Sequence, residues 1–150
     1  MSISFEGQVA IVTGAGGGLG RSHAIELARR GAKVIVNDLG GAMDGTGGSS
    51  ESAELVVAEI KALGGQALSN GGSVSDRAGA KSIIEDAMSA WGRVDVLINN
   101  AGILRDKSFS KMELEDFQMV VDVHLMGAVY CTHAAWPIMR EQNYGRILMT

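Results

Sequence analysis

The chain has 150 residues, 46% of them hydrophobic and 20% charged, and its formal net charge is −4. This composition is typical of a globular protein that is long enough to bury a core of its own. The acidic balance and the lack of a basic stripe argue against nucleic acid or an anionic membrane as the main partner, and no apolar run is long enough to span a bilayer.

The chain begins with MSISFEGQ, which lacks the cationic and apolar regions of a secretory signal. Its single cysteine, Cys131, excludes an internal disulfide and favours a reducing compartment. We therefore expect a cytoplasmic protein, or a peroxisomal one if a eukaryotic chain carries a C-terminal signal outside this sequence.

Apolar residues alternate along the chain between the continuous runs of buried strands and the spaced stripes of amphipathic helices. The runs predict strands over 9–13, 33–38, 66–69, 94–99 and from 146 onward. The stripes predict helices over 19–30, about 53–63, after a cap at Asp76, and over 113–139. In the second helix the stripe consists of Ala53, Val56, Val57, Ile60 and Leu63. Residues 39–50 indicate a flexible loop, long for a strand-to-helix connection.

Strict alternation of strand and helix is typical of an α/β protein with one parallel sheet and helices on both faces. Because crossovers between parallel strands are right-handed, we expect a doubly wound Rossmann sheet in three α/β/α layers, with strand order 3-2-1-4-5. The whole of 1–150 is then one nucleotide-binding domain.

Five glycines lie in the stretch VTGAGGGLG, between the first strand and the first helix. A helix N-terminus offers unpaired N–H groups and a partial positive charge, and the lack of Cβ atoms lets a diphosphate approach the backbone. The spacing is T-G-x-x-x-G-x-G rather than the common G-x-G-x-x-G, and no P-loop lysine follows. The predicted diphosphate-binding residues are Gly14, Gly16, Gly17, Gly18, Leu19 and Gly20. A merely tight turn, the alternative, needs only one or two glycines.

Asp38 ends the second predicted strand, 18 residues after Gly20. A carboxylate at this place accepts hydrogen bonds from the ribose hydroxyls of an adenosine and repels a 2′-phosphate, so it favours NAD over NADP. The alternative is that Asp38 only caps the next turn. A flavodoxin-like FMN domain shares the topology but has no need of such an acid.

The stretch NNAG, formed by Asn99, Asn100, Ala101 and Gly102, ends the fourth predicted strand. Its amides can contact a cofactor or fix the strand ends through hydrogen bonds. Asn99 is the better cofactor candidate, and a structural role is equally open for Asn100. His23 and His133 have no clustered acid or thiol partners, so we expect no metal site.

Taken together, T-G-x-x-x-G-x-G, Asp38 and NNAG resemble the short-chain dehydrogenase/reductase family over essentially the whole chain. The stretches TGAGGGLGR, VNDLGG, NNAGILRDKSF, HLMG and YGRILMT are similar to one branch of it, the (3R)-hydroxyacyl-CoA dehydrogenase units of peroxisomal multifunctional enzymes and their bacterial relatives. That branch uses NAD, in agreement with Asp38. The resemblance therefore implies hydride transfer between nicotinamide and a 3-hydroxyacyl-CoA.

At two positions the sequence departs from the family pattern. Ser73 and Val74 stand where the family usually has Asp-Val facing the adenine, and we assign both to the cofactor site. His124 replaces the asparagine that the family carries on its long helix. The resemblance implies that His124 helps to hold a water in a proton relay. The alternative is a core histidine, because His124 lies on the apolar stripe that includes Phe117 and Leu125.

The resemblance also implies a catalytic Ser just past Thr150, followed by Tyr-x-x-x-Lys, so that 1–150 is the N-terminal part of a longer single-domain enzyme. Tyr130 and Tyr144 do not supply this motif, because Ala134 and Leu148 follow four residues later. The alternatives are another family member, such as a 3-oxoacyl-carrier-protein reductase or a hydroxysteroid dehydrogenase, and a catalytically silent nucleotide-binding protein.

Charges and a second apolar stripe suggest further contacts. In the loop 103–109, Arg105 and Lys107 are candidates for the phosphates of an acyl carrier, with solvated loop charges as the alternative. The helix 113–139 carries two apolar stripes, where a surface helix needs only one. We take the second stripe to be covered by another subunit and predict a homodimer or homotetramer. It consists of Met119, Val123, Met126, Tyr130 and Ala134.

Overall fold

The computed structural model describes residues 3–42, 44–47 and 50–150. Their strands form one five-stranded parallel sheet in the order β3-β2-β1-β4-β5, which confirms the predicted topology. The strands are β1 (Val9–Val12), β2 (Lys33–Asn37), β3 (Gln66–Asn70), β4 (Val96–Asn99) and β5 (Arg146–Met149). Part of the predicted loop 39–50 lies outside the described residues, at 43 and 48–49.

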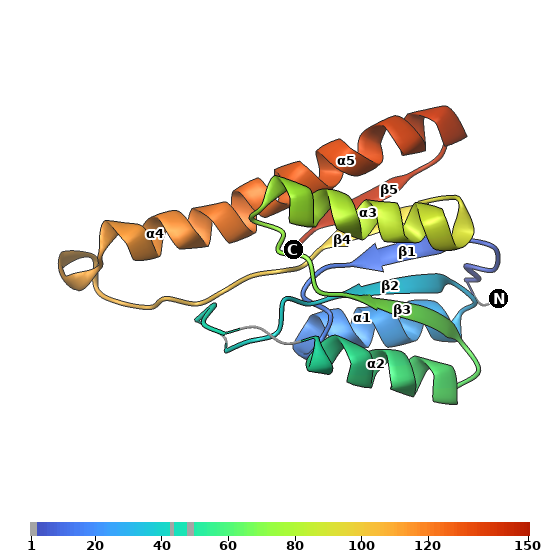
Figure 1. The fold of residues 1–150 in the computed structure, drawn as a ribbon, viewed down its shortest axis with the longest axis horizontal. Helices are drawn as coiled ribbons and strands as arrows, with labels where there is room; N and C mark the ends of the chain where they lie inside the picture. Colours follow the sequence, from blue (N-terminus) through green and yellow to red (C-terminus); the bar gives the residue numbers. More distant parts are fainter. Residues whose placement is uncertain (1–2, 43, 48–49) are drawn as a thin grey trace.

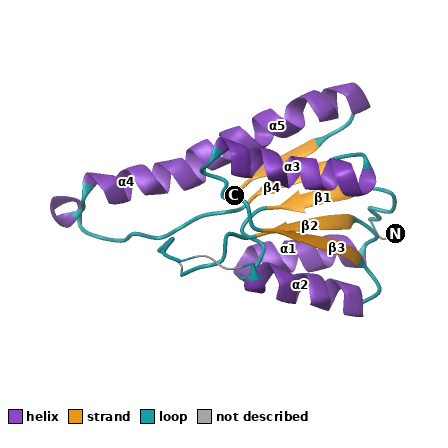
Figure 2. Cartoon of the chain, in the orientation of Figure 1, coloured by secondary structure: helices purple, strands orange, loops and turns teal. Residues whose placement is uncertain are grey.

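Helices cover both faces of the sheet, as Figures 1 and 2 show. One face carries α1 (Gly18–Arg29) and α2 (Glu51–Ala62), and the other carries α3 (Arg77–Trp91) and α5 (Gly127–Gln142). Asp76 caps α3 as predicted, because its carboxylate accepts a hydrogen bond from the Gly79 N–H at 2.8 Å. Among the described residues, no helix is apolar over a length that could cross a membrane.

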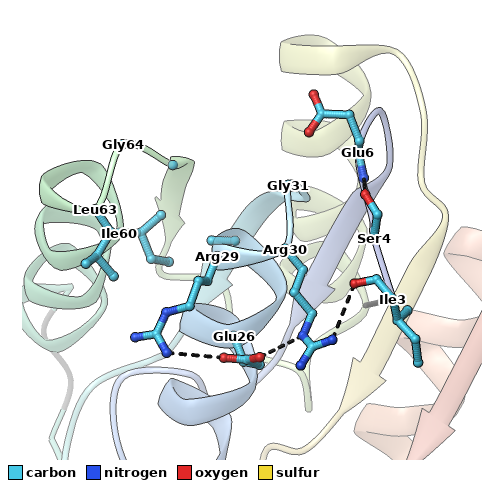
Figure 3. A pocket seen from close by; sticks show the side chains of 12 residues that line it. Ile3, Ser4, Glu6, Glu26, Arg29, Arg30, Gly31, Ile60, Leu63 and Gly64 are labelled. Atoms are coloured by element: carbon cyan, nitrogen blue, oxygen red, sulfur yellow. Dashed lines mark hydrogen bonds and ion pairs between the residues drawn. The ribbon is translucent and has the colours of Figure 1, made fainter. Parts of the chain in front are cut away.

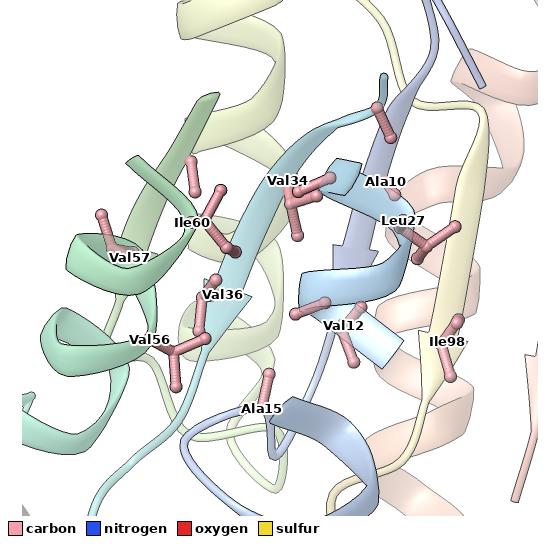
Figure 4. Packing of buried hydrophobic residues seen from close by; sticks show 14 of the residues in the cluster. Ala10, Val12, Ala15, Leu27, Val34, Val36, Val56, Val57, Ile60 and Ile98 are labelled. Atoms are coloured by element: carbon pink, nitrogen blue, oxygen red, sulfur yellow. The ribbon is translucent and has the colours of Figure 1, made fainter. Parts of the chain in front are cut away.

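Each face of the sheet has its own core, because neighbouring side chains of a strand point to opposite faces. Val34 and Val36 of β2 pack with Ile60 of α2 on one face (Figure 4), whereas Ile35 packs with Ile83 of α3 on the other. This two-sided burial explains why the strands are continuously apolar. Fully burying one such side chain contributes about 1.5–3 kcal/mol.

Some predicted boundaries were wrong by one or two residues. β4 begins at Val96 rather than Val94, and the reason is local. The side chain of Gln142 accepts a hydrogen bond from the Val94 N–H at 2.9 Å and donates one to the Val94 carbonyl at 2.7 Å, so a side chain satisfies this residue in place of a strand. Leu63 was expected in the core but is 54% exposed, because α2 ends at Ala62.

The predicted helix 113–139 consists of three successive helical elements, which a separate short turn precedes. A short 3-10 turn, η1 (Phe109–Lys111), comes first; then α4 (Leu114–Val121) leads through a π-helical turn, η2 (Asp122–Met126), into α5. α4 extends past the edge of the sheet (Figure 1), so Phe117 is 53% exposed and Leu125 is 59% exposed. The expectation that these two side chains face inward was therefore wrong.

The two apolar stripes of this helix only partly follow their predicted roles. Val123, Tyr130 and Ala134 pack against the core that α3 shares with the sheet, and the Arg77 guanidinium lies 5.5 Å from the centre of the Tyr130 ring. The assignment of this stripe to a subunit interface was wrong. Leu125, Val129 and Trp136 reach the surface, and Met119 is the member of the predicted second stripe that is also exposed, at 40%.

Candidate functional site

The predicted site residues follow four strands whose carboxyl ends meet at one edge of the sheet. Main-chain hydrogen bonds join these ends directly: Ala15 N–H to the Asn37 carbonyl at 2.8 Å, and Asp38 N–H to the Asn70 carbonyl at 3.0 Å. Here the order of strands reverses, since β1 lies between β2 and β4. This is the place where doubly wound sheets bind their ligands.

The turn after β1 is fastened to the segment after β4 by two side chains. The Thr13 hydroxyl accepts hydrogen bonds from the N–H groups of Asn100 and Ala101, each at 3.0 Å. In return, the Asn100 amide donates to the carbonyls of Thr13 at 3.0 Å and Gly14 at 3.1 Å. Asn100 therefore shapes the crevice, and the contribution of Thr13 was missed although it begins the T-G-x-x-x-G-x-G pattern.

Gly14 and Gly20 allow close approach within this corner. Gly14 has φ +62, and a Cβ placed on it would lie 2.8 Å from the Ala101 Cα. A Cβ on Gly20 would collide with the Gly14 carbonyl oxygen and would lie 2.5 Å from the Asn100 amide nitrogen. Both residues therefore bring α1 and the turn against the segment after β4.

Gly17 and Gly18 instead border open space at the start of α1. A Cβ on either residue would meet none of the described atoms within 4 Å, and Gly18 has φ +53. The first turn of a helix has unpaired N–H groups and a partial positive charge, and α1 carries no acid there. Leu19, 71% exposed, flanks this space. A diphosphate therefore fits the turn sterically and electrostatically.

Asp38 is held in place before any ligand arrives. One carboxylate oxygen accepts the Gly16 N–H at 2.8 Å, and the other accepts the Gly40 N–H at 2.7 Å. Each oxygen keeps a lone pair for a further donor. Asp38 does cap the turn that follows it, and the same contacts orient its carboxylate toward the glycine turn.

Ser73 and Val74 follow β3 and are fixed by a buried amide network that the sequence did not reveal. The Asn37 amide donates to the Gly72 carbonyl at 2.9 Å, and the Gly72 N–H donates to the Asn70 side chain at 2.8 Å. The Ser73 hydroxyl pairs with that of Ser75 at 3.0 Å. The Ser73 hydroxyl keeps capacity for a further hydrogen bond to a ligand, because a hydroxyl can donate one and accept two.

The Asn99 side chain lies apart from this crevice. Its amide donates to the Thr132 hydroxyl of α5 at 3.2 Å, and the residue is only 7% exposed. Its carbonyl oxygen has no hydrogen-bond partner among the described residues. Adjacent strand residues point to opposite faces, so the structure brings Asn100, and not Asn99, to the glycine turn.

His124 lies in the π-helical turn and contacts the segment after NNAG. Its Nε2 lies 3.0 Å from both the N–H nitrogen and the carbonyl oxygen of Ile103. A Cβ on Gly102 would lie 2.6 Å from the imidazole ring, so Gly102 makes room for it. His124 is exposed, which contradicts the core-histidine alternative. π-Helical turns often occur at functional sites.

Arg105 and Lys107 are paired within the chain. Both donate to the carboxylate of Asp116, Arg105 at 2.6 Å and Lys107 at 2.8 Å. The hydrogen bond from Lys107, and next the one from Arg105, lower the pKa of Asp116. Arg105 also donates to the Asp44 carbonyl at 2.8 Å. These charges therefore tie the loop to α4. Searching the described residues for three clustered His, Cys, Asp or Glu side chains finds no metal-binding group.

Two hollows lie away from the glycine turn. One of about 620 Å³ is bordered by the ends of α1 and α2 (Figure 3), where Glu26 pairs with both Arg29 and Arg30 and so neutralises much of their charge. The other, of about 530 Å³, is an apolar groove along α5 and β5. Its lining residues are Leu125, Ala128, Val129, Thr132, His133, Trp136, Pro137 and Met149.

The chain is similar to known proteins over nearly its whole length. The family model described as short chain dehydrogenase matches residues 8–150. Peroxisomal multifunctional enzyme type 2 of Drosophila melanogaster is 55% identical over 99% of this chain, and peroxisomal multifunctional enzyme A of Dictyostelium discoideum is 55% identical over 100% of it. The chain spans only 24% and 33% of these two relatives.

A solved structure shares the fold and is similar in sequence. The 7α-hydroxysteroid dehydrogenase solved with NADH and 7-oxo glycochenodeoxycholic acid superposes with a TM-score of 0.87 at 32% identity, over 97% of this chain and 53% of that one. The glycine turn, Asp38 and the NNAG corner thus occur on the expected sheet, in the expected order. The chain belongs to the short-chain dehydrogenase family.

Proposed function

We propose that this chain is the NAD-binding part of a longer single-domain dehydrogenase that acts on a 3-hydroxyacyl-CoA. The observation that carries the proposal is the pairing of an open helix N-terminus at Gly18, with its partial positive charge, and an oriented carboxylate at Asp38. The first suits a diphosphate, and the second suits the hydroxyls of the adjoining ribose. A nicotinamide cofactor, when bound, accepts or supplies the hydride.

The chain's own residues bind and orient in this proposal. The N–H groups at the start of α1 hold the diphosphate, and Asp38 holds the ribose. His124 holds the Ile103 peptide and thereby fixes the segment after NNAG. The proton-transferring Ser, Tyr and Lys belong to the part of the protein that follows Thr150. The stretches that resemble (3R)-hydroxyacyl-CoA dehydrogenase units, among them NNAGILRDKSF and HLMG, support the acyl-CoA substrate.

NAD is preferred over NADP in this proposal because a 2′-phosphate would meet the negative charge of Asp38. We expect NADH to bind at least tenfold more tightly than NADPH, measured through the fluorescence of Trp91 and Trp136 and through the melting temperature. Asp38→Ala should reduce this preference. Preference of the wild-type protein for NADPH would refute the assignment.

The substrate class is tested on the full-length protein, with 3-hydroxyacyl-CoA and a hydroxysteroid supplied in parallel with NAD. The steroid is the relevant alternative substrate, because the chain is similar to a 7α-hydroxysteroid dehydrogenase. We expect turnover of the acyl-CoA in preference to the steroid. NADH binding without turnover of either substrate would favour the catalytically silent alternative.

The proposal includes a homodimer or homotetramer, formed through the apolar surface of Leu125, Val129 and Trp136. This replaces the stripe inferred from sequence. We place the protein in a reducing compartment, the cytoplasm or in a eukaryote the peroxisome, where the free thiol of Cys131 persists.

A further inference from the structure

Ser52, the second residue of α2, has a buried hydroxyl whose oxygen finds no hydrogen-bond partner among the described residues. Native proteins leave few buried polar atoms unpaired, because the group gives up its hydration without compensation. An unpaired hydroxyl beside a candidate binding site therefore calls for a partner that the unliganded protein does not supply.

The hydroxyl faces the same point as the carboxylate of Asp38. A Cβ placed on Gly16 would lie 2.5 Å from the Ser52 oxygen and 2.7 Å from one Asp38 oxygen. These two groups therefore leave no room for a side chain at position 16. α2 therefore brings a donor and acceptor, Ser52, next to an acceptor, Asp38, at the glycine turn.

The charges around Ser52 favour a neutral ligand group over an anion. The first turn of α2 contains Glu51 and Glu54, and Asp38 is close by. A phosphate here would meet the carboxylate of Asp38, which lies beside the same point as the Ser52 hydroxyl. A hydroxyl of the ligand can donate its proton to Asp38 and still accept a hydrogen bond on its oxygen. The Ser52 hydroxyl can donate that second hydrogen bond.

We propose that Ser52 is a further cofactor-contacting residue, whose hydroxyl donates to the adenosine ribose hydroxyl held by Asp38. The inference rests on the proposed function, since it requires that Asp38 receives this ribose. It assigns to the start of α2 a share in recognising the unphosphorylated sugar. Ligand binding then satisfies a hydroxyl that folding leaves unpaired.

The test is Ser52→Ala in the full-length protein, with NADH and reduced nicotinamide mononucleotide as the two probes. The mononucleotide lacks the adenosine ribose. We expect roughly 3- to 10-fold weaker NADH binding, the effect of one neutral hydrogen bond, with unchanged binding of the mononucleotide. Ser50→Ala is the matched control, because its exposed hydroxyl pairs with Glu54 at the same helix end.

Melting temperatures separate this role from a structural one. Ser52→Ala removes an unpaired group, so the unliganded variant should melt at or above the wild-type temperature, while the rise produced by NADH should be smaller. A lower melting temperature with an unchanged NADH dissociation constant, or equal losses for both probes, would overturn the inference. Failure of the wild-type protein to bind NADH would instead overturn the proposed function, and the role of Ser52 with it.

Discussion

Individual glycines of the β1–α1 turn serve different physical ends. Gly14 and Gly20 let α1 approach the segment after β4, and Gly16 makes room for Asp38 and Ser52. Gly18 borders open space and has φ +53, so its missing side chain both leaves room for a ligand and permits the left-handed backbone of the turn. Substitutions in one short turn should therefore separate folding from cofactor binding.

Gly18→Ala should weaken NADH binding at least tenfold, because the new Cβ enters the space over the first turn of α1. It should also cost about 1–2 kcal/mol of stability, since φ is +53. Gly7→Ala is the matched control: Gly7 has φ +78 and open surroundings, but it precedes β1 and so lies at the opposite end of this strand from the glycine turn. Equal NADH affinities of the two variants, by fluorescence titration, would contradict this role of Gly18.

Cys131 makes stability depend on pH in the alkaline range. Burial raises the pKa of its thiol from 9.0 to about 12. Between these values the unfolded chain releases the proton and the folded chain keeps it, so the stabilisation is complete below pH 9 and is lost as the pH rises toward 12.

The free energy of unfolding in urea, compared at pH 8 and pH 10, measures this effect. Cys131→Ala should be less stable at pH 8 because it leaves a cavity, but it should lose about 1 kcal/mol less than the wild type on going to pH 10. Comparing the two proteins removes the other groups that titrate in this range. Equal losses would show that the thiol does not contribute.

At the scale of elements, α5 fixes the start of β4 through one side chain. Gln142 satisfies both backbone groups of Val94 and also donates to the Tyr144 carbonyl at 3.2 Å. We expect Gln142→Ala to lower the free energy of unfolding by about 2–3 kcal/mol, because buried backbone groups lose their partners. Gln118→Ala, whose amide pairs with Asp122 on the surface, should change it by less than about 0.5 kcal/mol. Urea unfolding distinguishes these outcomes. Equal losses of unfolding free energy in the two variants would contradict the role of Gln142 in holding the backbone of Val94.

The strands and their order could be predicted because each strand is a continuous apolar run, such as Val34–Val36 in β2, buried on both faces. The faces of α4 and α5 could not. Periodicity shows that Tyr130 and Leu125 lie on different stripes, but both stripes are apolar. Which one packs on α3 is decided by contacts with residues far away in sequence, among them Arg77.

At the scale of the whole molecule, the candidate site is made where four strands end together. Motif spacing predicted the glycine turn after β1 and put Asp38 and the NNAG stretch at the ends of their strands, but it favoured Asn99 over Asn100. It could not locate Ser52, which approaches Gly16 only because α2 packs beside α1. The Asn37–Asn70 contact likewise joins neighbouring strands 33 residues apart in sequence. Such contacts depend on tertiary packing and leave no local pattern.

Exposed apolar side chains line one face of η2 and α5. Leu125 is 59% exposed, Trp136 is 54% exposed, and the apolar groove of about 530 Å³ lies between them. Contiguous apolar surface of this kind marks interaction sites, and burying each large side chain contributes about 1.5–3 kcal/mol. If this face joins two copies of the protein, replacing its apolar side chains by charged ones removes the free energy gained by burying them. The new charges must also be desolvated when the two copies associate.

Leu125→Glu with Trp136→Glu should therefore shift the full-length protein to a smaller species in sedimentation velocity, with far-ultraviolet circular dichroism unchanged. Leu55→Glu is the matched control, because Leu55 is 66% exposed on α2, on the opposite face of the sheet. An unchanged mass for the double variant would place the interface elsewhere. A mass change in Leu55→Glu alone would move it to the face of α1 and α2, since only the face that carries the contact responds to a new charge.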